Sequence, residues 1–219
     1  MAKKVGLISM GQFSKASIKE DIAEILEPEF EIAGVGILDG LTPDYIREQY
    51  WPKDEESFIV STIEQGHVVK LAEKHAAKLI NEKIKFLENN GIVCNLLLCT
   101  GCFQGLKYEH FLIEPQKVIR AALQVLSVRK VGIIVPEQEQ IDDSFEQYEE
   151  FNPIVVAASP YGELEEIEKA CASFPSDREI ILLDCMGFTQ KMKKTVAKIT
   201  GKHVMLPRTL AASMLSNIG

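Results

Sequence analysis

The sequence predicts an α/β protein with two pseudo-symmetric lobes, each a mainly parallel sheet flanked by helices, and with the functional site between the lobes. Short segments rich in β-branched residues or leucine alternate with helix-like segments along all 219 residues. Several of these segments are apolar at successive positions, which is typical of strands covered on both faces in a parallel sheet. The same order of strands and helices occurs in each half of the chain, which indicates a repeated architecture.

Seven segments fit buried parallel strands. Residues 58–71 are ambiguous, because Glu64-Gln65-Gly66 could turn a β-hairpin before the next helix. The seven expected strands are Val5–Ser9, Glu31–Leu38, Val93–Cys99, Lys130–Val135, Pro153–Ala158, Glu179–Cys185 and Lys202–Leu206.

Capping residues mark the expected helices. Ser17 and Glu20 form a capping box, and Thr42-Pro43 fits a cap followed by proline in the first turn. A longer helix is expected to stop at Asn89-Asn90-Gly91, and its apolar stripe consists of Leu71, His75, Leu79, Ile84 and Leu87. Further helices are expected from Glu114-Pro115, along Leu164, Ile167, Ala170 and Cys171, after Phe188, and after Pro207.

The two halves follow the same plan. Each begins with a strand that opens with Val-Gly, at Val5-Gly6 and at Val131-Gly132, and each reaches a strand followed by cysteine and glycine. We therefore expect an N-terminal lobe at residues 1–128, with an insertion near residues 42–75, and a C-terminal lobe at residues 129–219. The C-terminal helix is a candidate to pack back on the first lobe.

Composition and charge exclude several classes of partner. The formal net charge is −8 and the isoelectric point is near 5.2, with no basic cluster, so we expect neither nucleic acid nor a membrane surface as partner. No segment approaches the ~20 apolar residues of a membrane span, and the first residues do not resemble a signal peptide. Five cysteines without zinc or disulfide spacing predict reduced thiols and a cytoplasmic location.

Cysteines end two of the expected strands, at the edge where parallel sheets bind ligands. Cys99 and Cys185 are each followed within two residues by glycine, whose backbone can approach a ligand closely. One thiolate could remove a proton from a carbon acid while a thiol on the opposite face returns one, without metal or cofactor. A free thiol titrates near ~8.5, so backbone amides or a helix end would have to stabilise the thiolate. Packing is the competing interpretation, and Cys102 is an alternative to Cys99.

Other polar residues carry weaker signals. Cys94 and Cys171 are expected to pack in the core, and Asp184 could either tune the neighbouring thiol or hydrogen-bond backbone. The acidic run Glu137–Glu150 is interpreted as a solvated helix face. Structural roles are expected for the histidines, which lack metal-ligand spacing: His67, His75, His110 and His203.

Six short motifs resemble landmarks of the AroM family, which is grouped with the aspartate/glutamate racemase superfamily. The most specific is Leu183-Asp184-Cys185-Met186-Gly187-Phe188. The others are Gly11-Gln12, Leu38-Asp39-Gly40-Leu41, Leu98-Cys99-Thr100-Gly101, Ile133-Ile134-Val135-Pro136 and Ser159-Pro160-Tyr161. The resemblance runs nearly end to end and implies two similar α/β lobes.

The resemblance implies that Cys99 and Cys185 match the two catalytic cysteines of the superfamily. The residues implied to contact substrate are Gln12, Thr100, Gly101, Met186, Gly187 and Tyr161. The expected activity is a cofactor-independent racemase or epimerase of a small carboxylate or cyclic carbon acid. A cysteine-dependent decarboxylase or isomerase, and a non-catalytic protein that binds a small metabolite, are the alternatives. A homodimer is compatible with the resemblance.

Overall fold

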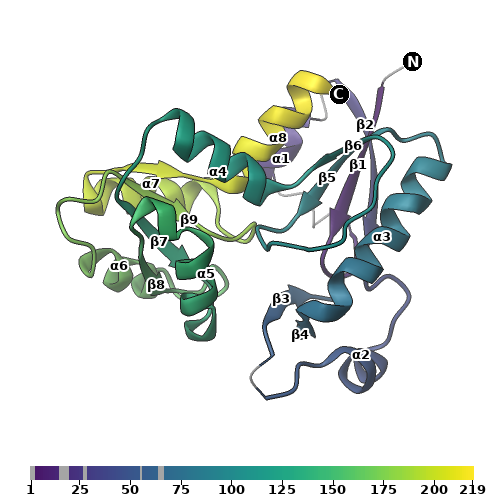
Figure 1. The fold of residues 1–219 in the computed structure, drawn as a ribbon, viewed down its shortest axis with the longest axis horizontal. Helices are drawn as coiled ribbons and strands as arrows, with labels where there is room; N and C mark the ends of the chain where they lie inside the picture. Colours follow the sequence, from purple (N-terminus) through teal and green to yellow (C-terminus); the bar gives the residue numbers. More distant parts are fainter. Residues whose placement is uncertain (1–2, 15–19, 27–28, 55, 64–66) are drawn as a thin grey trace. The chain divides into compact units, whose positions relative to one another are not determined.

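The computed structural model describes residues 3–14, 20–26, 29–54, 56–63 and 67–219, and these form two compact units (Figure 1). The first unit comprises Met1–Glu114 with Ala211–Gly219, and the second comprises Pro115–Leu210. In chain order the elements are β1 (Lys3–Ser9), α1 (Glu20–Leu26), β2 (Phe30–Gly36), α2 (Pro43–Tyr50), β3 (Phe58–Thr62), β4 (Val68–Ala72), α3 (Glu73–Asn89), β5 (Cys94–Leu98), β6 (Phe111–Ile113), α4 (Pro115–Val125), β7 (Val131–Val135), η3 (Gln138–Gln140), α5 (Ile141–Gln147), η4 (Glu149–Phe151), β8 (Ile154–Ala157), α6 (Leu164–Ala172), β9 (Ile180–Leu183), α7 (Gln190–Thr200), β10 (His203–Met205) and α8 (Pro207–Ile218).

The first unit is built on a parallel sheet with the strand order β2-β1-β5-β6. Helix α3 packs on this sheet, because its buried residues Ile80 and Ile84 share one apolar cluster with Ile8 of β1 and Leu97 of β5. A two-stranded antiparallel hairpin, β3–β4, precedes α3 and contributes Leu71 to the same cluster.

The second unit repeats this sheet. Its order β10-β9-β7-β8, taken from the other edge, is β8-β7-β9-β10, and all of its pairs are parallel. Strand β7 is buried on both faces, with Ile134 in one apolar cluster and Ile133 in the other. Burial on both faces explains the continuous apolar segments of the sequence, because each face of the sheet is covered by helices.

The two sheets correspond strand by strand, so that β1, β2, β5 and β6 match β7, β8, β9 and β10. In the second unit only α6 connects β8 to β9. Helix α2 and the β3–β4 hairpin therefore have no counterpart there, and they fall within residues 42–75. The predicted α/β fold with two similar parallel-sheet lobes is confirmed.

Most expected elements are present. All seven strands form, and their ends differ from the expected bounds by at most two residues. Thr42 caps α2, accepting a hydrogen bond from Tyr45 N at 3.3 Å, and Pro43 begins the helix. Leu71 was expected in the long helix but lies in β4, because the chain extends and pairs with β3 before α3 begins.

One strand was not expected, and two expected features lie outside the described residues. Strand β6 was not expected, since it has only three residues. Ser17 of the capping box and the turn at Glu64-Gln65-Gly66 lie outside the described residues. Among the helices that the structure describes, none has both the length and the apolar character needed to cross a bilayer.

Candidate functional site

The same short turn follows β5 in the first sheet and its counterpart β9 in the second. After β5, Gly101 N donates a hydrogen bond to Cys99 Sγ at 3.4 Å. After β9, Gly187 N donates to Cys185 Sγ at 3.2 Å. As whole residues, Cys99 and Cys185 are both partly exposed. Each Cys-X-Gly turn therefore points a backbone N–H at a sulfur, an arrangement that favours the negatively charged thiolate.

The strand register places the two cysteines at equivalent positions. In the first sheet Gly6 of β1 pairs with Asn95, four residues before Cys99. In the second sheet Gly132 of β7 pairs with Ile181, four residues before Cys185. The Val-Gly strand openings of the sequence thus provide matched reference points, and both thiols lie at carboxyl ends of parallel strands, where ligands bind.

The turn of the first unit has an apolar support. Phe103 is buried, and its ring lies 3.0 Å from the position that a Cβ on Gly101 would occupy. Thr100 is buried between the cysteine and the glycine. Cys102 is exposed, with Gln104 Nε2 3.9 Å from its sulfur, and it lies outside the Cys-X-Gly hydrogen bond. Cys99, and not Cys102, is therefore the cysteine that accepts the hydrogen bond of this turn.

The loop after β1 is tied to the loop after β2. The Asp39 carboxylate accepts hydrogen bonds from Phe13 N at 2.8 Å and from Gly36 N at 2.7 Å. Gln12 Nε2 donates to Leu41 O at 2.8 Å, so the Gln12 side chain is engaged in holding this loop. Glycine is required at position 36, because a Cβ there would lie 2.3 Å from Gly11 O.

In the second unit, Tyr161 lies over the cysteine turn. A Cβ on Gly187 would lie 2.8 Å from Tyr161 Oη and 2.7 Å from Pro160 Cγ, so only glycine allows this approach. The Tyr161 side chain also hydrogen-bonds the Cys185 thiol. The structure thus brings together Cys185, Gly187 and Tyr161, and about half of the Tyr161 surface is exposed.

Two buried charged residues lie beside the Cys185 turn. Arg208 is 1% exposed, and its Nη2 donates a hydrogen bond to Met186 O. Asp184 is also buried and accepts a hydrogen bond from Ser144 Oγ at 3.4 Å. Arg208 was missed in the sequence, although a lone arginine within the mostly apolar segment 204–212 is a usable signal.

Opposing effects act on the pKa of the Cys185 thiol. Burial raises the pKa of the Cys185 thiol to about 11, and the Asp184 carboxylate raises that pKa further. Hydrogen bonds from Gly187 N and the Tyr161 side chain, and the charge of Arg208, act in the lowering direction. The amide assistance expected from the sequence is present at Cys185, but burial outweighs it and the thiol pKa stays raised.

Cys94, Cys171 and His75 pack against other parts of the protein. Cys94 and Cys171 are buried, which confirms their packing role, and burial raises both thiol pKa values, that of Cys171 to about 11. The His75 ring packs edge-on against Tyr50 with ring centroids 5.4 Å apart. Within the described residues no cluster of histidine, cysteine and carboxylate side chains could hold a metal ion.

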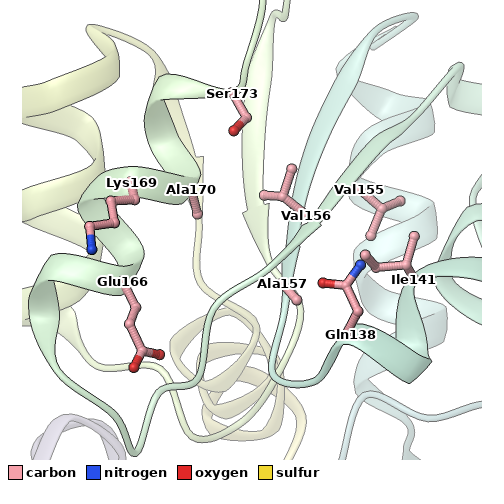
Figure 2. A pocket seen from close by; sticks show the side chains of 9 residues that line it. All are labelled: Gln138, Ile141, Val155, Val156, Ala157, Glu166, Lys169, Ala170 and Ser173. Carbon is pink, nitrogen blue, oxygen red and sulfur yellow. The ribbon is translucent and has the colours of Figure 1, made fainter.

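An open groove lies elsewhere in the second unit, over the exposed edge of β8 (Figure 2). Its volume is about 480 Å³. Gln138 and Ile141 lie on one side, and Glu166 and Lys169 of α6 lie on the other. None of the residues predicted to be functional lines this groove.

Comparison with known proteins supports the motif resemblance. The model of the family described as AroM protein matches residues 5–218. A search of curated protein sequences finds no match.

Solved structures with the same fold cover nearly the whole chain. Arylmalonate decarboxylase has a TM-score of 0.57 and 16% identity, over 99% of this chain and 93% of that chain. The maleate isomerase Iso from Pseudomonas putida has a TM-score of 0.65 and 11% identity, over 100% and 93%. Glutamate racemase from Aquifex pyrophilus has a TM-score of 0.57 and 16% identity, over 99% and 84%. At these identities the likeness establishes the fold.

Proposed function

Because the chain belongs to the AroM family, we propose that it is a cofactor-independent racemase or epimerase of a small carboxylate or cyclic carbon acid. The observation that carries the proposal is the pair of Cys-X-Gly turns at register-equivalent strand ends. The racemase, isomerase and decarboxylase activities of proteins with this fold support it. The proposal requires Cys99 and Cys185 to reach one substrate from opposite faces.

In the proposed reaction, a cysteine thiolate removes the proton from the substrate carbon next to a carbonyl group. The electron pair left behind is delocalised into that carbonyl as an enolate, and the other thiol donates a proton to the opposite face. The pKa of Cys185 is raised to about 11, so we assign Cys185 as the thiol that donates a proton and Cys99 as the thiolate that removes one. This assignment holds for one direction of the reaction. The reverse direction needs the thiol and thiolate exchanged.

The surrounding residues would divide the remaining work. Gly101 N and Gly187 N already donate to the sulfurs, so each would stabilise a thiolate whenever that cysteine loses its proton. The Thr100 hydroxyl, the Met186 backbone and the Tyr161 hydroxyl would contact the substrate carboxylate or the developing enolate charge. Gln12 would hold the neighbouring loop through its bond to Leu41 O.

Deuterium exchange tests the proposal directly. The probes are the separate enantiomers of aspartate, glutamate and a 5-substituted hydantoin, incubated in deuterated buffer and followed by proton NMR and chiral chromatography. We expect loss of the α-proton signal together with inversion for at least one probe. Because each thiol handles one proton, Cys99→Ser and Cys185→Ser should each lower the rate by about 10²–10⁴-fold.

Cys102→Ser is the matched control, since Cys102 is an exposed cysteine near the same turn. It should exchange at the wild-type rate. Wild-type rates in both Cys99→Ser and Cys185→Ser would overturn the two-thiol mechanism, and so would exchange that depends on Cys102 instead of Cys99.

A cysteine-dependent decarboxylase or isomerase is the second candidate. One solved neighbour is a Nocardia farcinica maleate cis-trans isomerase mutant with a covalently bound succinylcysteine intermediate, at 12% identity and a TM-score of 0.61. In such chemistry a thiolate adds to a double bond, the new single bond rotates, and elimination restores both the double bond and the thiolate. Turnover of maleate or 2-phenylmalonate without exchange of any amino acid or hydantoin would support this candidate over the racemase.

A protein that binds a metabolite without turning it over is the third candidate. It predicts that every probe is recovered unchanged, while a bound probe shifts the thermal midpoint of unfolding. Packed thiols would then react slowly with iodoacetamide, whereas a functional thiolate would react fast and be protected by its ligand.

A further inference from the structure

We propose that Arg208 is a positioning residue that fixes the orientation of the Met186–Gly187 peptide and thereby directs Gly187 N–H at the Cys185 sulfur. This proposal deepens the proposed function, because it assigns the group that prepares Cys185 for proton transfer. The hydrogen-bond geometry itself does not depend on which reaction, if any, the protein catalyses.

The two hydrogen bonds belong to opposite sides of one peptide plane. Met186 O accepts from Arg208 Nη2, and Gly187 N donates to Cys185 Sγ at 3.2 Å. The described peptide bonds are all trans, so the C=O and N–H of this peptide point in opposite directions. Holding the carbonyl on the arginine side therefore keeps the N–H on the sulfur side, and a flipped peptide would lose both contacts at once.

Arg208 is suited to this task because it is rigidly placed. Its side chain is 1% exposed, and it follows Pro207, the first residue of α8. A guanidinium is strongly hydrated in water, so it stays buried only where protein groups compensate for the lost solvent. Its positive charge also lowers the pKa of the Cys185 thiol, which adds to the effect of the correctly oriented amide.

The first unit shows that the fold does not demand an arginine at this position. In the first sheet Asn95 pairs with Leu112, and the helix α4 begins three residues later at Pro115. In the second sheet Ile181 pairs with Val204, and α8 likewise begins three residues later, at Pro207.

The residues after the two prolines are therefore equivalent. They are Gln116, which is 6% exposed, and Arg208. The residues immediately before the two cysteines also differ, as Leu98 and Asp184. The first repeat thus has the neutral residues Leu98 and Gln116 where the second has the charged residues Asp184 and Arg208. The start of the helix does not itself require a charged residue, so we connect the charge of Arg208 with Cys185.

The charged and titratable groups that influence Cys185 are few. Among the described residues they are Asp184 directly after β9, Tyr161 in the loop after β8, and Arg208 on α8. Asp184 opposes Arg208, since its carboxylate raises the thiol pKa while the guanidinium lowers it. This opposition supplies a variant of opposite sign, Asp184→Asn, which changes the charge and leaves Arg208 in place.

The test measures alkylation of each cysteine separately in the full-length protein. Wild type, R208M, R208K and D184N are treated with iodoacetamide across alkaline pH, and the modified peptides are quantified by mass spectrometry. Below a thiol pKa the thiolate fraction changes about tenfold per pKa unit, so the rate ratio at one pH reports the shift. Cys102, which is exposed, serves as the internal standard in every sample.

We expect R208M to slow alkylation of Cys185 by about tenfold or more, because the variant loses both the charge and the peptide donor. R208K retains the charge but not the planar guanidinium, so it should slow Cys185 by a smaller factor, and D184N should accelerate it. The rate of Cys102 should stay within about twofold in all variants.

An unchanged or faster Cys185 rate in folded R208M would overturn the proposal. If circular dichroism shows that R208M does not fold, R208K decides, and a wild-type Cys185 rate in that variant overturns it. If the protein exchanges deuterium but the alkylation rate of Cys185 does not depend on Arg208, the role of Arg208 is disproved and the proposed function stands. An Arg208-dependent Cys185 rate without any turnover or deuterium exchange would sink only the proposed function.

Discussion

The turns at Cys99 and Cys185 have one backbone design and two chemical surroundings. Each places a sulfur at an equivalent strand end, and the backbone N–H of the glycine two residues later points at that sulfur. Around Cys99 the support is the buried Phe103 ring, whereas around Cys185 it includes a buried arginine, a buried carboxylate and a tyrosine hydroxyl. Repetition of the fold supplies a matched turn in each unit, and charged groups act on the pKa of the Cys185 thiol in the second.

Under the proposed function, such a difference would suit a pair of acid–base groups. Proton transfer across a substrate needs one thiolate and one thiol at the same time, and two identical turns would leave the choice between them unbiased. The raised pKa of Cys185 biases the pair toward a protonated Cys185. The asymmetry should therefore be visible in variants that touch only one turn.

The largest difference is expected from a methyl group added to each glycine. At Gly187 the added Cβ would lie 2.7 Å from Pro160 Cγ, whereas at Gly101 the closest approach is 3.0 Å, to Phe103 Cζ. Gly187→Ala should displace Tyr161 from Cys185 and lower proton exchange by about 10²-fold, with a loss of about 1–3 kcal/mol of unfolding free energy. Gly101→Ala should retain most activity, because the edge of one ring has to move only slightly.

Exchange rates and urea denaturation of the two variants check this contrast. Equal losses of activity would show that the turns are mechanically equivalent despite their surroundings. A stable but inactive Gly101→Ala variant would shift the greater steric sensitivity to the first turn.

The loops after β1 and β7 offer a second comparison. Asp39 ties the first loop to the next strand through Phe13 N and Gly36 N, while in the second unit Glu137 and Gln140 form only a local capping box. Asp39→Ala should cost about 1–2 kcal/mol of stability, since two backbone donors lose a carboxylate acceptor. It should also reduce exchange activity, because Gln12 lies in the loop that is released.

Glu137→Ala is the matched control, with an expected cost of about 0.5–2 kcal/mol and unchanged activity. Chemical denaturation combined with the exchange assay measures both quantities. If Asp39→Ala kept full activity while losing stability, the β1 loop would have only a structural role.

A third contrast isolates one hydroxyl group. Tyr161→Phe removes the hydrogen bond to Cys185, and that bond acts to lower the thiol pKa. The variant should therefore raise the pKa of Cys185 and slow its alkylation by about threefold to tenfold, while Cys99 keeps its rate. Peptide-resolved alkylation provides the measurement, and an equal change at both cysteines would contradict a local effect of Tyr161.

Periodic apolar segments and chain order were enough to predict the fold and the matched cysteines. The parallel strands are covered on both faces, and this burial imposes a pattern that is visible in the sequence. Strand β6 escaped prediction because Phe111–Ile113 is too short to establish a pattern. The glycine two residues after each cysteine was also enough to predict a sharp turn, because that inference depends on local backbone geometry.

The positioning residues were harder to predict because their partners are distant along the chain. Arg208 contacts the carbonyl of a residue 22 positions earlier, and Asp39 binds an amide 26 positions earlier. Neither of these separations along the sequence follows from helical or strand periodicity. Such contacts are defined only when the strands are placed side by side in the sheet.

The smallest predicted effect tests whether the asymmetry of the two turns is local. Asp177 belongs to the second unit and contacts Arg178 and Lys130, which lower its pKa to about 2. Because the folded-state pKa is below the unfolded value near ~3.8, its contribution to stability is present above that value and disappears as pH falls through about 2. Asp177→Asn should thus flatten acid unfolding between these pH values and leave the Cys185 alkylation profile unchanged. A shifted Cys185 profile in this variant would show that surface charges of the second unit reach the thiol, and the difference between the turns would then belong to the whole unit rather than to Asp184, Arg208 and Tyr161.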